Sequence, residues 1–211
     1  MDEWVSSAEQ IAISQIIKGT RLLGFVSPNG ASSTAGLTRM VAEAMGRSGL
    51  KILMANLNTA HEEVVRQNTA VATSEPWGSI KGETNDFIDI ISANVTDQTR
   101  YIFNNNEWLG SFFAETLRSY STVVLNLPPF IGDQKNQLSP LAAASVCEAV
   151  VLICPAGRVT RPQIANALYL LKSANVKVIG LVVEEDEQQS SWRDVAWPAK
   201  WTRFPAPAKR A

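Results

Sequence analysis

LLGFVSPNGASSTAG, residues 22–36, is the stretch that decides the fold. Its first five residues, Leu22 to Val26, are apolar apart from one glycine, as expected for a strand buried on both faces. A turn rich in Ser, Asn and Gly follows. After it, apolar residues recur at helical spacing until about Gly49, namely Leu37, Met40, Val41, Ala44 and Met45. A strand, a glycine-containing turn and a helix in this order form the setting in which backbone N–H groups bind phosphate.

The same alternation of short apolar runs and helix-period segments continues along the chain. Five further runs are predicted as strands: Ile52 to Ala55, Phe87 to Ser92, Val123 to Leu127, Val150 to Cys154 and Val176 to Val183. Two more helices are predicted at Trp108 to Leu117 and Ile164 to Leu171. This rhythm predicts an α/β fold, a three-layer, doubly wound, mostly parallel sheet with helices on both faces.

Two regions stand outside the rhythm. Residues 58–86 are polar and contain Pro76, which predicts a long loop with at most a short helix around Glu62 to Gln67. The second region is the end of the chain, where four aromatic residues are set among prolines. We therefore divide the chain into a single domain, residues 1–189, and a tail, residues 190–211.

Composition limits the classes of function. With 211 residues, 45% of them apolar, and a formal net charge of -1, the chain fits one globular domain and gives no support to nucleic-acid binding. Cys147 and Cys154 lie in apolar surroundings, which indicates core residues rather than a zinc site, and His61 reads as a solvated loop residue. No apolar run reaches the length of a membrane span and no signal peptide is visible, so we expect a cytoplasmic protein.

Four further motifs accompany the first turn. They are GLKILMANLN at residues 49–58, VVLNLPP at 123–129, AGRVTR at 156–161 and GLVVE at 180–184. Together with the first turn they resemble the cytoplasmic domain of bacterial tyrosine autokinases and, more broadly, the MinD and ParA ATPases. The resemblance extends from about Leu22 to Glu184 and implies the fold of the P-loop nucleotide hydrolases.

The phosphate loop implied by this resemblance, Ser27 to Gly36, departs from the family pattern S-x-x-P-G-E-G-K-S-T. The two family glycines fall on Ala31 and Ser33, the lysine on Thr34 and the magnesium-binding Ser or Thr on Ala35. Thr34 cannot offset phosphate charge, and Ala35 has no oxygen for a metal ion. Residues with a Cβ at the glycine positions also restrict the backbone.

The acidic positions of the resembled motifs are neutral here. The aspartates fall on Asn56, Asn58 and Asn126, and the asparagine that reads the nucleotide base falls on Glu184. Asparagine keeps the shape of aspartate without its charge, and a pocket without metal or phosphate is more stable without three clustered carboxylates. Because phosphoryl transfer depends on charge stabilisation, we expect no catalytic residue, no metal site, and lost or weak binding of ATP and magnesium.

These departures lead to a hypothesis of function. We interpret the chain as a non-catalytic pseudo-kinase or pseudo-ATPase that acts as a binding or regulatory partner in bacterial exopolysaccharide or capsule synthesis and export. The resemblance implies a membrane polysaccharide co-polymerase or an active tyrosine kinase as the partner, and self-association stays open. Two alternatives remain: a divergent but active ATPase or tyrosine kinase, and a ParA-like or MinD-like positioning protein.

The tail adds a separate surface. Its aromatic residues are Trp192, Trp197, Trp201 and Phe204, and its basic residues exceed its acidic ones. Aromatic side chains among cations suit a groove on a partner protein or the headgroup layer of an anionic membrane, which would place the protein at the periphery of the inner membrane. In the alternative, the tail folds back and its tryptophans cover an exposed edge of the core. Arg158 and Arg161 are either interface cations or solvated loop residues.

Overall fold

The computed structural model describes residues 2–30, 34–58, 76–78, 81–82, 87–131 and 138–184. Their elements follow one another as α1 (Asp2–Lys18), β1 (Leu22–Val26), α2 (Thr34–Arg47), β2 (Ile52–Asn56), β3 (Lys81–Gly82), β4 (Ile88–Ser92), α3 (Asp97–Phe103), α4 (Asn106–Thr116), β5 (Thr122–Asn126), α5 (Pro140–Ser145), β6 (Ala149–Pro155), α6 (Arg161–Ser173) and β7 (Val178–Glu184).

The strands form one sheet in the order β3-β4-β2-β5-β1-β6-β7. All neighbouring pairs are parallel except β3 with β4, which is antiparallel. From β1 the chain goes to β2 on one side, and later to β6 on the other, so the strand order reverses around β1. Open parallel sheets bind ligands at the carboxyl ends of their strands beside such a reversal.

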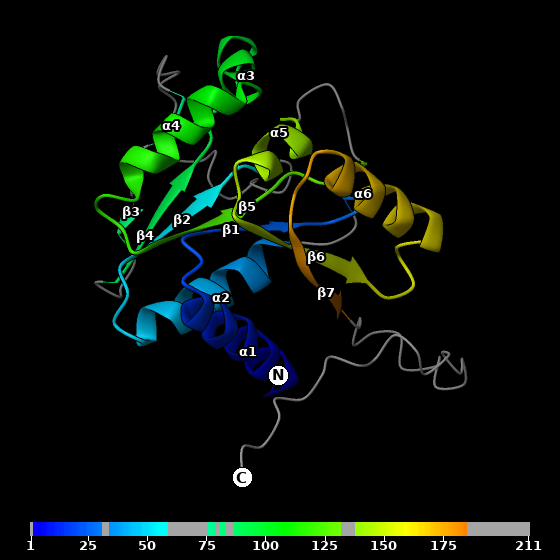
Figure 1. Ribbon diagram of the computed structural model, residues 1–211, viewed down its shortest axis with the longest axis horizontal. Helices are drawn as coiled ribbons and strands as arrows, with labels where there is room; N and C mark the ends of the chain where they lie inside the picture. The colour runs from blue at the N-terminus through cyan, green and yellow to red at the C-terminus, as the bar shows by residue number, and fades with distance from the viewer. Residues whose placement is uncertain are drawn as a thin grey trace.

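Helices cover both faces of the sheet, as Figure 1 shows. α1 and α2 lie on one face, where their side chains pack against Leu23, Phe25 and Val124 in one apolar layer. α3 to α6 lie on the other face, where Phe103, Phe113 and other side chains form the second layer. The predicted three-layer α/β architecture is therefore confirmed.

The predicted strands are all present, with ends within two residues of the prediction. β1, β2, β5 and β6 are buried along their whole length, as apolar runs covered on both faces should be. β7 differs, because it lies at the edge of the sheet and alternates between half-buried and exposed residues. Cys147 and Cys154 are buried, as predicted.

The predicted helices are also found, and the structure adds α1, α3 and α5. α3 begins at a capping box in which the Thr96 side chain accepts from the Thr99 backbone N–H and the Thr99 side chain accepts from the Thr96 N–H. β3 lies within the region predicted as a long loop and pairs with β4, so that part of the prediction was wrong. The short helix expected at 62–67 and His61 lie outside the described residues. In the described part of the chain, no helix is long and apolar enough to cross a membrane.

Candidate functional site

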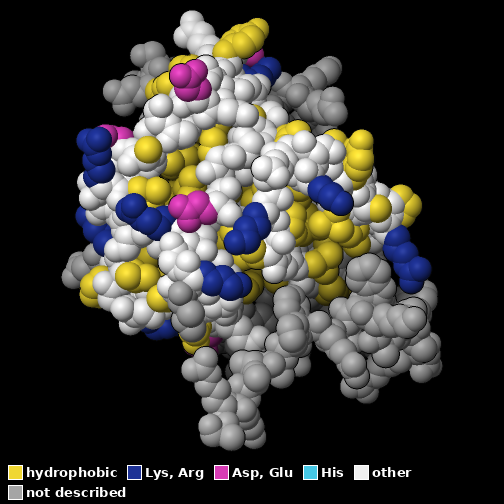
Figure 2. All heavy atoms as spheres, in the orientation of Figure 1, with side chains coloured by type: hydrophobic (Ala, Val, Ile, Leu, Met, Phe, Trp, Pro, Cys, Tyr) yellow, Lys and Arg dark blue, Asp and Glu magenta, His cyan; other side chains and the backbone are white. Residues whose placement is uncertain are grey.

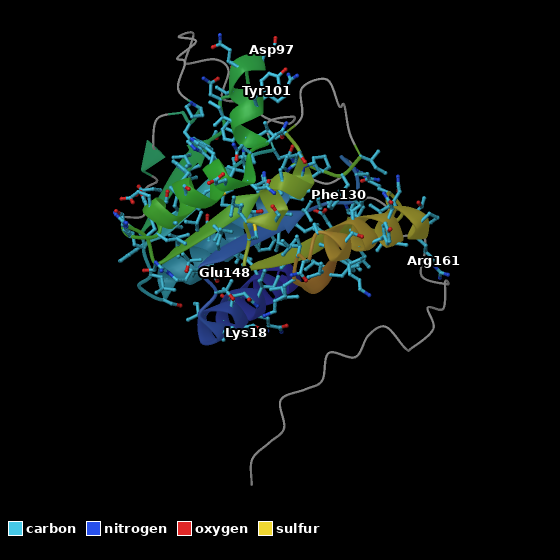
Figure 3. The ribbon with its side chains drawn as sticks, turned by 45° about the horizontal axis from the view of Figure 1, so that its top comes forward. Lys18, Asp97, Tyr101, Phe130, Glu148 and Arg161 are labelled. Atoms are coloured by element: carbon cyan, nitrogen blue, oxygen red, sulfur yellow. The ribbon has the colours of Figure 1, made fainter. Side chains whose placement is uncertain are left out.

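The polar residues of the resembled motifs meet at the carboxyl edge of the sheet. Asn56 ends β2, Asn126 ends β5, Ser27 follows β1, and Thr34 begins α2. Because the β2–β5 register pairs Asn56 with Asn126, these two side chains come to lie side by side. Phe130 and Arg161, labelled in Figure 3, mark this end of the sheet, whereas Glu148, which precedes β6, marks the opposite end.

Three of these side chains form a continuous chain of hydrogen bonds, which we call the Thr34–Asn126–Asn56 network. The Thr34 hydroxyl donates to Asn126 Oδ1. Asn126 Nδ2 donates to Asn56 Oδ1 over 2.8 Å, and the backbone N–H of Asn58 donates to the same oxygen over 3.1 Å. The sequence shows that these side chains are neutral. It did not predict that they form hydrogen bonds with one another.

The network is closed to solvent. Thr34 and Asn126 are each 1% exposed, Asn56 is 7% exposed and Asn58 is 6% exposed. The backbone of Thr34 is also fixed within α2, because the Thr38 hydroxyl donates to the Thr34 carbonyl over 2.7 Å. Every atom of the network is formally uncharged, so it offers neither a cation for phosphate nor a carboxylate for magnesium. A ligand would have to break these hydrogen bonds to reach Asn126.

The described part of the turn is bonded to its own surroundings. The Gly30 N–H donates to the Ile131 carbonyl over 2.9 Å, and the Phe130 N–H donates to the Ser27 carbonyl over 3.1 Å. The Asn29 side chain donates to the Arg158 carbonyl over 2.8 Å, which ties the turn to the start of α6. The Gly30 N–H is thus used inside the protein. Ala31 and Ser33 lie outside the described residues, and Ala35, which is described, follows Thr34 in the first turn of α2.

Two buried polar atoms beside the network have no hydrogen-bond partner. They are Ser27 Oγ, in a residue that is 1% exposed, and Asn58 Oδ1. Leaving such an atom buried and unpaired costs about 1–3 kcal/mol. Asn58 stands where the resembled family has an acidic residue, and its Oδ1 is one of these two atoms. The sequence placed Ser27 at the start of the implied phosphate loop but did not predict its burial, since serine in a turn carries no signal of burial.

The other predicted residues lie apart from the network. Glu184 ends β7, and β6 separates that strand from β1; its carbonyl accepts the Ala156 N–H over 2.7 Å. Arg158 and Arg161 are exposed residues before and at the start of α6. Trp192, Trp197, Trp201 and Phe204 lie outside the described residues.

Groups with displaced pKa values lie away from this site. Burial raises the pKa of the Cys154 thiol to about 11, and burial together with the charge of Glu148 raises the pKa of Cys147 well above its ordinary value. Thiols held in the protonated form are poor nucleophiles. Within the described ranges, no three His, Cys, Asp or Glu side chains gather as a metal site requires.

The fold is the parallel α/β fold that bacterial tyrosine kinase domains and MinD-like proteins also have. The sequence matches no model of a known protein family and no curated protein.

Three solved structures show the likeness. The BceF tyrosine kinase domain superposes with a TM-score of 0.66 at 15% identity, covering 87% of this chain and 76% of that one. The kinase domain of the Escherichia coli tyrosine kinase ETK gives 0.66 at 12% identity, covering 89% and 75%. The MinD cell division protein of Aquifex aeolicus gives 0.53 at 12% identity, covering 77% and 68%. At these identities the likeness concerns the fold.

Proposed function

We propose that this chain is a pseudo-kinase or pseudo-ATPase, a protein with the fold of nucleotide-binding tyrosine kinase domains that acts by binding rather than by catalysis. Its setting would be bacterial exopolysaccharide or capsule synthesis and export. The shared fold supports the likeness to tyrosine kinase domains, and the uncharged network supports the loss of catalysis. The sequence resemblance to tyrosine autokinases of these systems supports the setting.

The Thr34–Asn126–Asn56 network is the observation that carries the proposal. Magnesium takes oxygen ligands and favours carboxylates, and phosphates need cations or free N–H donors. The position of the family lysine holds a threonine whose hydroxyl is bonded to Asn126, and Asn126 is in turn bonded to Asn56. Each side chain of the network is therefore engaged with a neighbour, and none carries charge.

A protein that acts by binding needs a partner. We propose a membrane polysaccharide co-polymerase or an active tyrosine kinase, met by a protein that is cytoplasmic or lies peripherally at the inner membrane. On this proposal the fold presents surfaces and the former nucleotide edge only keeps the sheet and α2 together. In the aromatic tail, Trp201 and Phe204 supply a second candidate surface for a partner or for the membrane.

Isothermal titration of the full chain with ATP and magnesium tests the proposal. We expect no saturable heat, with any dissociation constant weaker than about 1 mM. An active tyrosine kinase domain of the same fold, titrated under the same conditions, is the positive control. Tight, magnesium-dependent binding would remove the basis of the proposal.

The two alternatives have their own signatures. A divergent active enzyme would release phosphate from ATP, and the Asn126→Ala variant would lose that release. A positioning protein of the MinD type would change between monomer and dimer when ATP is added, which light scattering detects. We expect neither phosphate release nor an ATP-dependent change of mass.

A further inference from the structure

β7 is an edge strand with an unusual surface. β6 pairs with it on one side, and among the described residues no strand pairs with it on the other. Its sequence, VIGLVVE, is apolar from Val178 to Val183 apart from one glycine. Long apolar edge strands are hazardous because they expose unpaired backbone groups beside apolar side chains, and proteins commonly cover them.

Two residues of β7 form an exposed apolar strip, which we call the β7 strip. Leu181 is 36% exposed and Val183 is 54% exposed. They are two positions apart and so point to the same face of the sheet. Their register partners on β6, Leu152 and Cys154, belong to the apolar layer under α6, so the strip extends that layer outward.

The surface around this strip is also apolar. α6 covers the same face of the sheet and exposes Leu168 and Tyr169, at 37% and 68%. Figure 2 shows hydrophobic side chains gathered over β6 and β7. The apolar layer under α6 is therefore exposed to solvent at this edge of the sheet.

The chain itself continues from this point. Glu184 ends β7, and 27 residues follow it, 185–211, beginning with the polar stretch EDEQQSS and continuing with Trp192 and Trp197. At about 3.3 Å per residue, eight residues from Glu184 to Trp192 span up to about 26 Å, whereas Leu181 lies only about 10 Å back along the strand. Trp192 can thus reach the β7 strip after one reversal of the chain. Direct attachment also gives this segment a high local concentration at the strip.

We propose that the chain's own C-terminal segment covers the β7 strip, with Trp192 and Trp197 packed on Leu181 and Val183. This inference is independent of the proposed loss of nucleotide chemistry. Large aromatic side chains are suited to this place because each buries a wide apolar area. The polar stretch 185–191 provides the reversal, and the remaining residues, from Pro198 on, stay available for a partner.

Fluorine NMR of the full chain labelled with 5-fluorotryptophan tests the proposal. The resonances of Trp192 and Trp197 are assigned by single Trp→Phe substitutions and compared with a synthetic peptide of residues 185–211. In the unaltered chain we expect the chemical shifts of both tryptophans to differ from their values in the peptide. In the Leu181→Ser/Val183→Ser variant we expect them to move to the peptide positions.

Two controls keep the result interpretable. Trp77 packs in an aromatic cluster with Phe103 and Phe112, far along the sheet order from β7, so its resonance reports that the variant remains folded. Ile13→Ser removes from α1 an apolar side chain that is 56% exposed, about as exposed as Val183. This variant should leave the resonances of Trp192 and Trp197 unchanged.

Three outcomes would overturn the proposal. The first is tail resonances in the unaltered chain that coincide with the free peptide. The second is a difference that grows with protein concentration together with a dimeric mass, which would assign the strip to a second copy. The third is a difference that arises only with vesicles containing phosphatidylglycerol, which would assign the tryptophans to an anionic membrane.

Discussion

Changing Asn126 to aspartate tests the closure of the network most directly. In the native chain Asn126 needs both halves of its amide: Oδ1 accepts from the Thr34 hydroxyl and Nδ2 donates to Asn56 Oδ1. An ionised aspartate keeps the first hydrogen bond and replaces the donor by a second acceptor. Two oxygens then face each other where the donor and acceptor atoms stand 2.8 Å apart. Asn56 cannot simply turn its amide, because its Oδ1 also accepts the Asn58 N–H.

The expected magnitude follows from burial. Asn126 is 1% exposed, so the new carboxylate would lie outside the reach of water. A buried charge without a full set of donors destabilises a protein by about 3–5 kcal/mol, and the retained Thr34 hydroxyl offsets part of this, which leaves about 3 kcal/mol at pH 7.5. The protonated carboxyl, in contrast, has an O–H that can donate to Asn56 Oδ1. In that state we expect a loss below about 1 kcal/mol.

This difference fixes the sign of the pH dependence. Burial raises the pKa of the introduced carboxyl in the folded state above its unfolded value of about 3.9. The variant is therefore close to the native chain below that unfolded value and loses stability as pH rises through the folded-state pKa. Guanidinium unfolding of both proteins between pH 4 and pH 7.5, with the free energy of unfolding extrapolated to water, measures the change.

Asn105→Asp is the matched control, since it makes the same chemical change at an exposed helix N-cap. Asn105 acts only as an acceptor there, from the Glu107 and Trp108 N–H groups, and a carboxylate can accept both. We expect a change within about 0.5 kcal/mol at every pH. If Asn126→Asp were as stable as the native chain at pH 7.5, or lost the same free energy at every pH, the network could not be closed as described.

Three further predictions concern packing and ionisation. Gly24→Ala should destabilise by about 2 kcal/mol, because its Cβ would lie 2.8 Å from Cys147 Sγ and 2.9 Å from Leu127 Cδ1. Gly110→Ala, in α4 with nothing within 4 Å, should instead stabilise by about 0.5–1 kcal/mol, and thermal unfolding of the two variants compares them. Because burial raises the pKa of both thiols, Cys147 and Cys154 should react with a disulfide reagent at pH 8 only after unfolding in denaturant; rapid reaction of the native chain would contradict their burial. Partial burial and the hydrogen bond to Asp89 raise the pKa of Tyr120 from 10.0 to about 12. The stability that the neutral phenol contributes should therefore be lost as pH rises through that range. In the Tyr120→Phe variant, alkaline unfolding curves should lack this loss of stability.

The sheet could be predicted from the sequence because its central strands are short, almost wholly apolar runs. Ile52–Asn56 and Thr122–Asn126 are buried at every position, and such runs do not suit surface helices or loops. α3 and α5 were not predicted because helices of 7 and 6 residues hold too few turns to show a period. Their starts are fixed by caps, where Thr96 and Ser139 accept backbone N–H groups.

The site could be predicted in part. The sequence motifs identified Thr34, Asn56 and Asn126 as residues of the site. Each lies at one end of a helix or strand that the sequence also predicts, namely α2, β2 and β5. The hydrogen bonds between them depend on the β2–β5 register and on the approach of α2, which are properties of the whole sheet. The bond from the Gly30 N–H to the Ile131 carbonyl could not be predicted for the same reason, because it joins two turns about a hundred residues apart.

The direction of the hydrogen bonds shows that the residues at this edge depend on one another. Thr34 donates, Asn126 accepts on one side and donates on the other, and Asn56 accepts. Asn126 must both accept and donate, which its amide can do and an ionised carboxylate cannot. In the resembled motifs a lysine and an aspartate stand at positions 34 and 126, and their opposite charges suit each other. With threonine at position 34, a carboxylate at position 126 would lose its counterion and face Asn56 as a second acceptor. Thr34 and Asn126 therefore suit each other as hydrogen-bond partners, and through them α2 is joined to β5.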